Sequence, residues 1–350
     1  MPEAVIDLFC GIGGLTKGLE LSGLNVVAGI DVDETCKFAY ERNNNSKFFC
    51  RDLSVINPAS LSELFPEKAT KILVGCAPCQ PFSKYTQRYR KKGHIDEKWK
   101  LLYSFSNIVD EVKPLIISME NVPELSKQKV FEDFVNHLYS LNYYVSWSIV
   151  YCPDYGVPQK RKRLVLLASQ LGDICIIPPI YTPDKYKTVS DAIRNLPEIA
   201  NGETCPTDKI HCATKMKDIN VRRIQQSVPG GTWKDWDKEL QLECHSKLTG
   251  KSYGAVYGRM KWDEPSPTIT TQFYGYGNGR FGHPEQNRAI SYREGALLQS
   301  FPEDYIFIDE NTKGFNRRQL GIHIGNAVPV ELGRAIGLSI IEHLNNLGVR

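Results

Sequence analysis

Short apolar runs alternate with amphipathic stretches along the first half of the chain. The apolar runs indicate strands, because they are brief, rich in Val, Ile and Leu, and bounded by Gly, Asn or Pro. They lie at 4–9, 25–29, 47–50, 71–74, 115–120, 144–150 and 164–168. Helical spacing of apolar residues occurs between them at 15–21, 35–41, 99–112 and 130–141. This alternation predicts an α/β fold with a doubly wound parallel sheet.

The second half has a different pattern. After residue 169, prolines interrupt the chain often and few periodic segments remain, although a helical period returns over 330–344. Glycines and aromatic residues such as Trp233 are frequent there, and we expect each aromatic to belong to a small core. The pattern predicts a Rossmann-like domain at 1–177, a smaller irregular domain at 178–318, and a C-terminal segment at 319–350 that packs back on the first domain.

Composition limits the classes that remain. Ten cysteines without regular spacing favour free thiols in a reducing compartment. No apolar run approaches the ~20 residues of a membrane span, and no secretory signal opens the chain, so we expect a cytoplasmic protein. The net charge of +3 excludes a polycation. Nucleic-acid binding would need a local patch, and 84–100 offers one, with seven Lys or Arg against two acidic residues.

The first strand runs into a glycine-rich turn, Gly11-Ile12-Gly13-Gly14, that opens a helix. Such a turn lets a ligand lie against bare backbone at a helix N-terminus. Asp31 ends the next strand 20 residues after Gly11, where it can accept hydrogen bonds from ribose hydroxyls. A dinucleotide fingerprint would require glycine where Thr16 stands. The residues therefore favour S-adenosylmethionine, which has a ribose and an adenine but no phosphate.

Cys79 follows the strand at 71–74, in Cys76-Ala77-Pro78-Cys79. Proline and glycine end regular structure there, so the thiol is expected at the carboxyl end of a strand, where open α/β sheets bind ligands. It is a candidate nucleophile, and the alternatives are a structural thiol or half of a metal or redox pair with Cys76. We expect no metal, because the chain has no second Cys-x-x-Cys.

Together these residues resemble the DNA (cytosine-5) methyltransferase family, of the bacterial or phage restriction-modification type. The resemblance covers most of the chain in order. It is carried by the turn at 9–14, by Pro78-Cys79-Gln80, Glu120-Asn121-Val122, Gln159-Lys160-Arg161-Lys162-Arg163, Arg293-Glu294 with 298–302, and Gly325-Asn326-Ala327-Val328-Pro329. The chain departs from the family at two positions. Leu297 stands where the family usually has arginine, and Ala77 stands where many members have proline or phenylalanine. These departures concern packing around the recognition domain and the pocket wall, and they leave the reacting groups unchanged.

The resemblance implies methyl transfer from S-adenosylmethionine to carbon 5 of a cytosine flipped out of duplex DNA, through a covalent adduct with Cys79. It implies that Glu120 acts at N3 and the 4-amino group, and that Arg163 faces O2, with Arg161 also in the catalytic set. The implied cofactor contacts are Phe9, Gly11, Ile12, Gly13, Gly14, Asp31, Val32, Asp52, Leu53, Pro78, Leu101, Asn326 and Val328. We expect DNA contacts from Gln80, Ser83, Lys84, Arg88, Arg90 and Lys91, and the candidate readers of base edges in the irregular domain are Gln272, Arg280 and Arg259.

On this resemblance, 1–177 is the methyltransferase domain and 178–318 the target-recognition domain. We expect a monomer that acts on double-stranded DNA and protects it from a restriction endonuclease. One alternative is a transfer RNA cytosine-5 methyltransferase, which the lack of a Cys-Phe-Thr tripeptide disfavours. Another is a non-catalytic DNA-binding protein on the same fold, which intact Cys79, Glu120 and Arg163 disfavour. A nicotinamide oxidoreductase comes third, because of Thr16.

Overall fold

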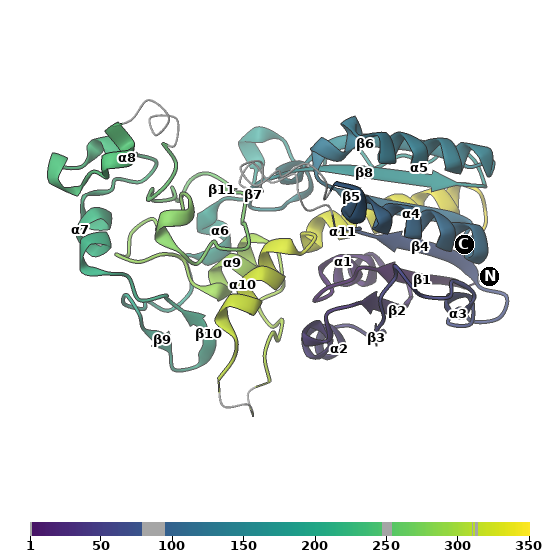
Figure 1. The fold of residues 1–350 in the computed structure, drawn as a ribbon, viewed down its shortest axis with the longest axis horizontal. Helices are drawn as coiled ribbons and strands as arrows, with labels where there is room; N and C mark the ends of the chain where they lie inside the picture. Colours follow the sequence, from purple (N-terminus) through teal and green to yellow (C-terminus); the bar gives the residue numbers. More distant parts are fainter. Residues whose placement is uncertain (1, 79–94, 247–253, 310, 312–313) are drawn as a thin grey trace. The chain divides into compact units, whose positions relative to one another are not determined.

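The computed structural model describes residues 2–78, 95–246, 254–309, 311 and 314–350 (Figure 1). The chain divides into two compact units. Unit 1 comprises Met1–Tyr155, Lys162–Ile180 and Val328–Arg350, and unit 2 comprises Gly156–Arg161 and Tyr181–Ala327. These units differ from the boundaries predicted at 177/178 and 318/319. The short segment 156–161 belongs to unit 2, and the C-terminal part of unit 1 begins only at Val328.

A seven-stranded sheet forms the centre of unit 1, in the order β3-β2-β1-β4-β5-β8-β6. Its strands are β1 (Glu3–Leu8), β2 (Val26–Asp31), β3 (Lys47–Cys50), β4 (Thr70–Gly75), β5 (Ile116–Asn121), β6 (Tyr144–Tyr151) and β8 (Lys162–Ser169). The helices are α1 (Gly14–Ser22), α2 (Lys37–Asn43), α3 (Ala59–Ser62), α4 (Ile95–Val112), α5 (Lys129–Ser140) and α11 (Val330–Asn346). Every strand predicted from the sequence is present, with ends shifted by no more than two residues.

The sheet is not wholly parallel, so this part of the prediction was wrong. β8 runs antiparallel to both β5 and β6, whereas the other pairs are parallel. The reason is the connection between β6 and β8. A parallel return needs a crossover of a dozen or more residues, usually a helix. Between Tyr151 and Lys162 the chain has only a 3₁₀ turn and the two-residue strand β7 (Gln159–Lys160).

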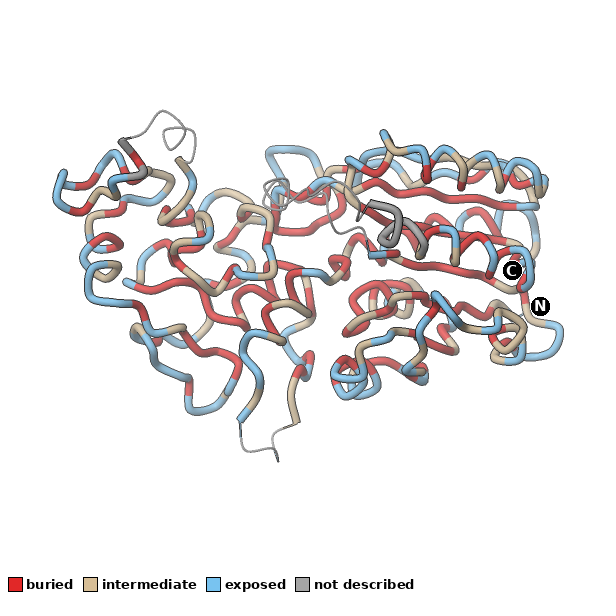
Figure 2. The backbone as a smooth tube through the Cα atoms, in the orientation of Figure 1, coloured by how far each residue is buried: buried red, intermediate tan, exposed pale blue. Residues whose placement is uncertain are grey.

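Helices cover both faces of the sheet, as a doubly wound fold requires. On β1, Ala4, Ile6 and Leu8 belong to a core cluster with side chains of α4 and α5, while Asp7 faces the other way, toward Thr16 of α1. Figure 2 shows the buried positions along the strands. Strands buried on both faces explain the nearly continuous apolar runs in the sequence.

The C-terminal helix α11 packs against α1 within unit 1. Glycines let the two backbones approach closely: a Cβ atom on Gly18 would lie 2.3 Å from the carbonyl oxygen of Val330. The ends of the chain also meet, because Arg350 pairs with Glu3 at 3.1 Å. The stretch 317–346 has the length and apolar composition of a membrane span, but 67% of its most apolar window is buried inside the structure. A core helix of a folded domain has these properties too.

Unit 2 contains short elements joined by long irregular segments. They are β7, α6 (Val189–Ile193), β9 (Thr204–Cys205), β10 (Asp208–Cys212), α7 (Asp218–Gln226), α8 (Glu243–Ser246), β11 (Ser266–Pro267), α9 (Tyr292–Leu298) and α10 (Arg317–Asn326). Trp233 and Trp236 are buried in a cluster with Leu240, which confirms the expectation that such aromatics form a local core. Glu294 joins Ser291 in a capping box at the start of α9 and accepts two bonds from buried Arg288.

Candidate active site

The glycine-rich turn joins β1 to α1 at the carboxyl edge of the sheet. Phe9, Gly11 and Gly13 all have positive φ, at 60°, 51° and 86°. The amide of Gly11 donates to Asp31 Oδ2 at 2.8 Å, so the acid at the end of β2 fixes the turn. A Cβ atom on Gly11 would meet no atom within 4 Å. Space therefore exists for a ligand against bare backbone, next to a carboxylate.

The rim of this turn continues onto β2 and β3. Val32 is 66% exposed directly after Asp31, and Asp52 is exposed after β3. Hydrogen bonds from Ser54 lower the pKa of Asp52, so this carboxylate stays ionised as an acceptor. Ile12 and Leu53 are buried and support the rim from below. The rim offers an apolar face between two acids, which suits a purine riboside.

Thr16, which breaks the dinucleotide fingerprint, has a structural role. Its hydroxyl donates to Asp7 Oδ2 at 2.7 Å, and its Oγ1 lies 3.2 Å from the hydroxyl of Tyr40. Tyr40 in turn bonds Ser46 at 2.7 Å. Asp7 is 1% exposed, and burial raises its pKa to about 7 against the lowering effect of the Thr16 bond. A buried acid therefore lies directly beneath the turn, a feature that our sequence reasoning did not single out.

Glu120 near the end of β5 is held from two sides. Its side chain is 2% exposed, and Oε1 lies 2.7 Å from Nε of Arg163, whose own side chain is 13% exposed. The other oxygen, Oε2, accepts from the thiol of Cys76 at 2.8 Å. Because β4 pairs in parallel with β5 and Gly75 lies opposite Met119, Cys76 follows in register opposite Glu120. The carboxylate is therefore fixed between the end of β4 and the start of β8.

The stem of the loop that leads to Cys79 is attached to β5 as well. Asn121 donates from Nδ2 to the carbonyl oxygen of Ala77 at 2.9 Å, and Pro78 is exposed. The predicted nucleophile and the basic segment after it lie outside the described residues: these are Cys79, Gln80, Ser83, Lys84, Arg88, Arg90 and Lys91. The described part of the site thus ends one residue before Cys79.

Arg161 does not join Arg163 at Glu120. It is 3% exposed in unit 2, where it donates to the carbonyl oxygens of Ile269 at 3.0 Å and Gly325 at 3.4 Å. Gln159 and Gln299 complete this hub through side-chain bonds to each other and to Arg161. These contacts support a structural role and give no support to the predicted catalytic one. The spacing of two residues could not reveal this, because an irregular residue separates β7 from β8.

The predicted DNA-reading residues of unit 2 differ from one another. Arg259 is buried, and its guanidinium donates hydrogen bonds to carbonyl oxygens such as those of Ile224 and His283. It is therefore unsuited to reading bases. Arg280 is half-buried and bonds the carbonyl oxygen of Gly231. Gln272 is exposed. Of the three, only Gln272 presents an exposed side chain.

The remaining predicted cofactor contacts lie on α4, at the end of α10 and in the link between α10 and α11. Leu101 is half-buried on α4. Asn326 is exposed as the last residue of α10 in unit 2, and Val328 is buried as the first residue of the C-terminal part of unit 1. The C-terminal end of α10 packs closely on the backbone of Thr270. Only glycine fits at position 325, because a Cβ atom there would lie 2.5 Å from that backbone.

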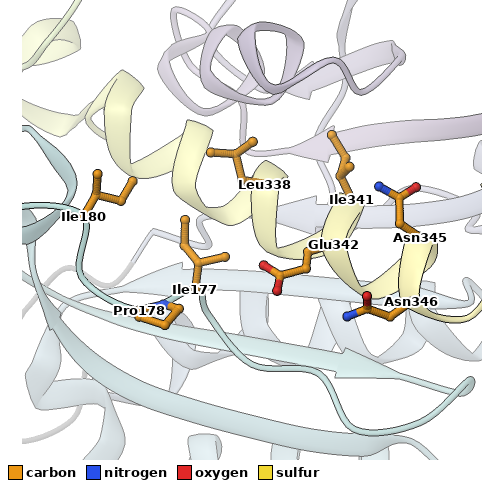
Figure 3. Close-up of a pocket in the computed structure, with 8 residues that line it drawn as sticks. All are labelled: Ile177, Pro178, Ile180, Leu338, Ile341, Glu342, Asn345 and Asn346. Atoms are coloured by element: carbon orange, nitrogen blue, oxygen red, sulfur yellow. The ribbon is translucent and has the colours of Figure 1, made fainter.

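A groove of about 520 Å³ opens in unit 1 between α11 and the segment after β8 (Figure 3). Its lining is Ile177, Pro178, Ile180, Leu338, Ile341, Glu342, Asn345 and Asn346. This lining includes none of the residues predicted from the sequence to bind cofactor or DNA. The candidate active site is instead at the carboxyl ends of β1, β2, β4 and β5.

Comparisons with known proteins agree along the whole chain. A family model described as C-5 cytosine-specific DNA methylase matches residues 4–342. The chain is 54% identical to the Type II methylase M.HgiDII of Herpetosiphon aurantiacus, over 100% of this chain and 98% of the relative. It is 31% identical to the Type II methyltransferase M1.BsuMI of Bacillus subtilis, over 95% of this chain and 79% of that protein.

Solved structures show the same fold. One is a DNA modification methyltransferase encoded within a prophage of E. coli, with a TM-score of 0.72, 22% identity, and coverage of 98% of this chain and 99% of that one. Another is the S. pombe Dnmt2 methyltransferase, with a TM-score of 0.60, 17% identity, and coverage of 99% of both chains. At such identities these structures establish the architecture alone.

Proposed function

Since the chain belongs to the C-5 cytosine-specific DNA methylase family and is a DNA (cytosine-5-)-methyltransferase, we propose that it modifies one cytosine within a specific duplex sequence through a covalent bond to Cys79. The observation that carries this proposal is Glu120, buried near the end of β5 with one carboxylate oxygen on Arg163 and the other on Cys76. A buried acid with fixed partners, bonded to the residue three positions before the nucleophile, is the arrangement needed to act on a pyrimidine ring.

The cofactor is S-adenosylmethionine, whose sulfonium supplies an electrophilic methyl group. The described residues fit its nucleoside part. Asp31 receives the Gly11 amide on Oδ2 and the Asp33 amide on Oδ1, which leaves lone pairs for ribose hydroxyls. Val32 offers an exposed apolar face for the adenine, and the ionised Asp52 can accept from its amino group. The bare turn at Gly11 and Gly13 allows close approach of the amino acid part.

The chemistry assigned to the chain's own groups follows from the poor nucleophilicity of carbon 5. The Cys79 thiolate adds to carbon 6 of cytosine, which makes carbon 5 an enamine carbon able to attack a methyl group. Glu120 holds a proton at N3 and accepts a hydrogen bond from the 4-amino group while negative charge moves into the ring. Arg163 keeps Glu120 in place and directs its guanidinium toward O2. A base such as water then takes the carbon 5 proton, the 5,6 double bond forms again, and the bond between carbon 6 and sulfur breaks to release the thiolate.

Access to the ring requires the nucleotide to leave the stacked duplex, at a cost of a few kcal/mol. The basic segment 84–100 is suited to holding the phosphates during this step, since it adjoins the nucleophile in sequence. Unit 2 is assigned to target recognition, with Gln272 as a reader of base edges. The Type II names of the relatives favour protection of DNA from a partner endonuclease. We expect the enzyme to act in the cytoplasm as a monomer.

The decisive experiment combines trapping with mapping. The purified protein is incubated with plasmid DNA, and 5-methylcytosine is located by bisulfite sequencing, with transfer RNA as a parallel substrate. A duplex carrying 5-fluorocytosine at the mapped site should form a stable adduct with the wild type. Cys79→Ser should form none and lose turnover, while Cys175→Ser, which changes an exposed thiol, should behave as the wild type. Full turnover of Cys79→Ser, or methylation of transfer RNA alone, would refute the proposal.

A further inference from the structure

Cys76 lies in the candidate active site but has no role in the chemistry proposed so far. It is the first residue after β4, half-buried, and three positions before Cys79. A cysteine at such a position is usually a small apolar filler. Its geometry here is more specific, because the thiol points at one oxygen of a carboxylate that is 2% exposed.

Strand register produces this contact. The parallel pairing of β4 with β5 runs from Ile72 opposite Ile116 to Gly75 opposite Met119, and one more step brings Cys76 opposite Glu120. A second step brings Ala77 opposite Asn121, whose amide donates to the Ala77 carbonyl oxygen. Side-chain bonds therefore continue the ladder beyond the last backbone pair. They connect the acid and the loop stem to each other.

The two oxygens of Glu120 have different partners: Oε1 is in an ion pair, and Oε2 accepts a hydrogen bond from a neutral thiol. The guanidinium of Arg163 takes Oε1 at 2.7 Å, and the thiol of Cys76 donates to Oε2 at 2.8 Å. With Arg163 alone, the carboxylate could rotate about its last bond, because terminal carboxylate torsions are broad. The second donor removes that freedom. It holds the plane of the carboxyl group in one orientation before the substrate arrives.

From this geometry we infer that Cys76 is a positioning residue for the methyl transfer, which acts by orienting the Glu120 carboxyl group and does not bond the cytosine itself. The inference rests on the proposed function of Glu120. Pre-organisation of an acid matters most where charge develops in the transition state. Loss of the donor should therefore reduce kcat and leave the binding of DNA and cofactor nearly unchanged.

The test compares Cys76→Ala with Cys76→Ser, and uses Cys175→Ala as the matched control at an exposed thiol of unit 1. We expect Cys76→Ala to lower the single-turnover methylation rate roughly tenfold or more, the usual effect of a lost hydrogen bond to a charged group. KM for DNA and cofactor should stay within about twofold of the wild type. Cys76→Ser should recover most of the rate, because its hydroxyl is again a donor. If the alanine variant does not fold, Cys76→Val removes the donor and keeps an apolar side chain of similar size.

A double-mutant cycle with Glu120→Gln separates positioning from a distorted loop. If Cys76 acts through Glu120, adding Cys76→Ala to Glu120→Gln should have no further effect. If it acts only by packing the Cys79 loop, the two losses should multiply and serine should not rescue. Either that result or a wild-type rate for Cys76→Ala would overturn the inference. A wild-type rate for Glu120→Gln would instead refute the proposed chemistry, so the two failures are distinguishable.

Discussion

Glu120 is a buried carboxylate that has one charged partner. Its side chain is 2% exposed, and the ion pair with Arg163 at 2.7 Å lies where water gives little screening. Removing one member of such a pair leaves the other charge buried without a partner, which destabilises the fold. Removing both members leaves no buried charge. The consequence concerns stability as well as catalysis.

We predict that Arg163→Ala lowers the free energy of unfolding by about 3 kcal/mol. Adding Glu120→Gln should return most of this stability, because the amide is neutral. Both variants should be inactive. Urea unfolding followed by circular dichroism measures the difference, with Lys162→Ala as the control at an exposed neighbouring position of β8. If the double variant is less stable than Arg163→Ala, the carboxylate is not held by this pair.

At this scale the sequence predicted which residues matter better than it predicted their partners. Glu120, Asp31 and the turn glycines could be located, because each ends a recognisable strand or opens a helix. The donor Cys76 could not, since its bond to Glu120 joins residues 44 positions apart and depends on strand register. Arg161 and Arg163 look equivalent in the motif. They separate because one is bonded to carbonyl groups of unit 2 and the other belongs to β8.

Among the elements, the contact between α1 and α11 joins the C-terminal segment to the N-terminal part of unit 1. Three glycines lie at this contact: Gly18 on α1, and Gly333 and Gly337 on α11. A Cβ atom on Gly18 would lie within 2.6 Å of three backbone atoms of α11, and one on Gly337 would lie 2.1 Å from the hydroxyl of Ser22. Backbone cannot move aside as a flexible side chain can, so the helices would have to separate.

Gly18→Ala should therefore destabilise the protein by about 1–3 kcal/mol, the usual cost of overpacking. Helix propensity alone predicts the opposite, a gain of up to about 1 kcal/mol. The midpoint of urea unfolding decides between the two, and Asn345→Ala, at an exposed position of α11, shows the effect of alanine without a clash. An unchanged or raised midpoint for Gly18→Ala would mean that the helices do not approach this closely.

The elements of unit 1 were predictable because each strand is a short apolar run that is bounded by residues such as Gly, Asn or Pro. Strand direction was not, since β8 looks like any buried strand and only the short path from β6 makes it antiparallel. Unit 2 was predictable only as irregular. Its organisation depends on buried polar groups such as Arg288 with Glu294, and composition gives no sign of which charged residues will be buried.

For the whole molecule, buried titratable groups of the two units change stability with pH in opposite directions. In unit 2, burial works against the charge of Glu294, but the bonds from Arg288 prevail and lower its pKa from 4.5 to about 2. A depressed acid contributes stability above pH 4.5, and this is lost as the pH falls toward 2. His283, 3.6 Å from Glu294, acts in the same direction, because burial lowers its pKa to about 4.

The pKa of Asp7 in unit 1 is shifted in the opposite direction. Burial raises its pKa from 3.8 in the unfolded chain to about 7, so the folded state binds more protons than the unfolded state between these values. Stability should therefore fall as the pH rises from about 4 to 7, by at most roughly 4 kcal/mol, since each pKa unit corresponds to about 1.4 kcal/mol.

Asp7→Asn should abolish this dependence. Between pH 5 and pH 8 the wild type should lose stability in unit 1, and the variant should lose markedly less, because an amide at this position does not titrate. Calorimetry of the full chain at both pH values measures this, with Glu67→Gln as an exposed acid of unit 1 for control. If the variant keeps the slope of the wild type, the proton is not held on Asp7, and the acid beneath the cofactor turn is ionised throughout the working range of the enzyme.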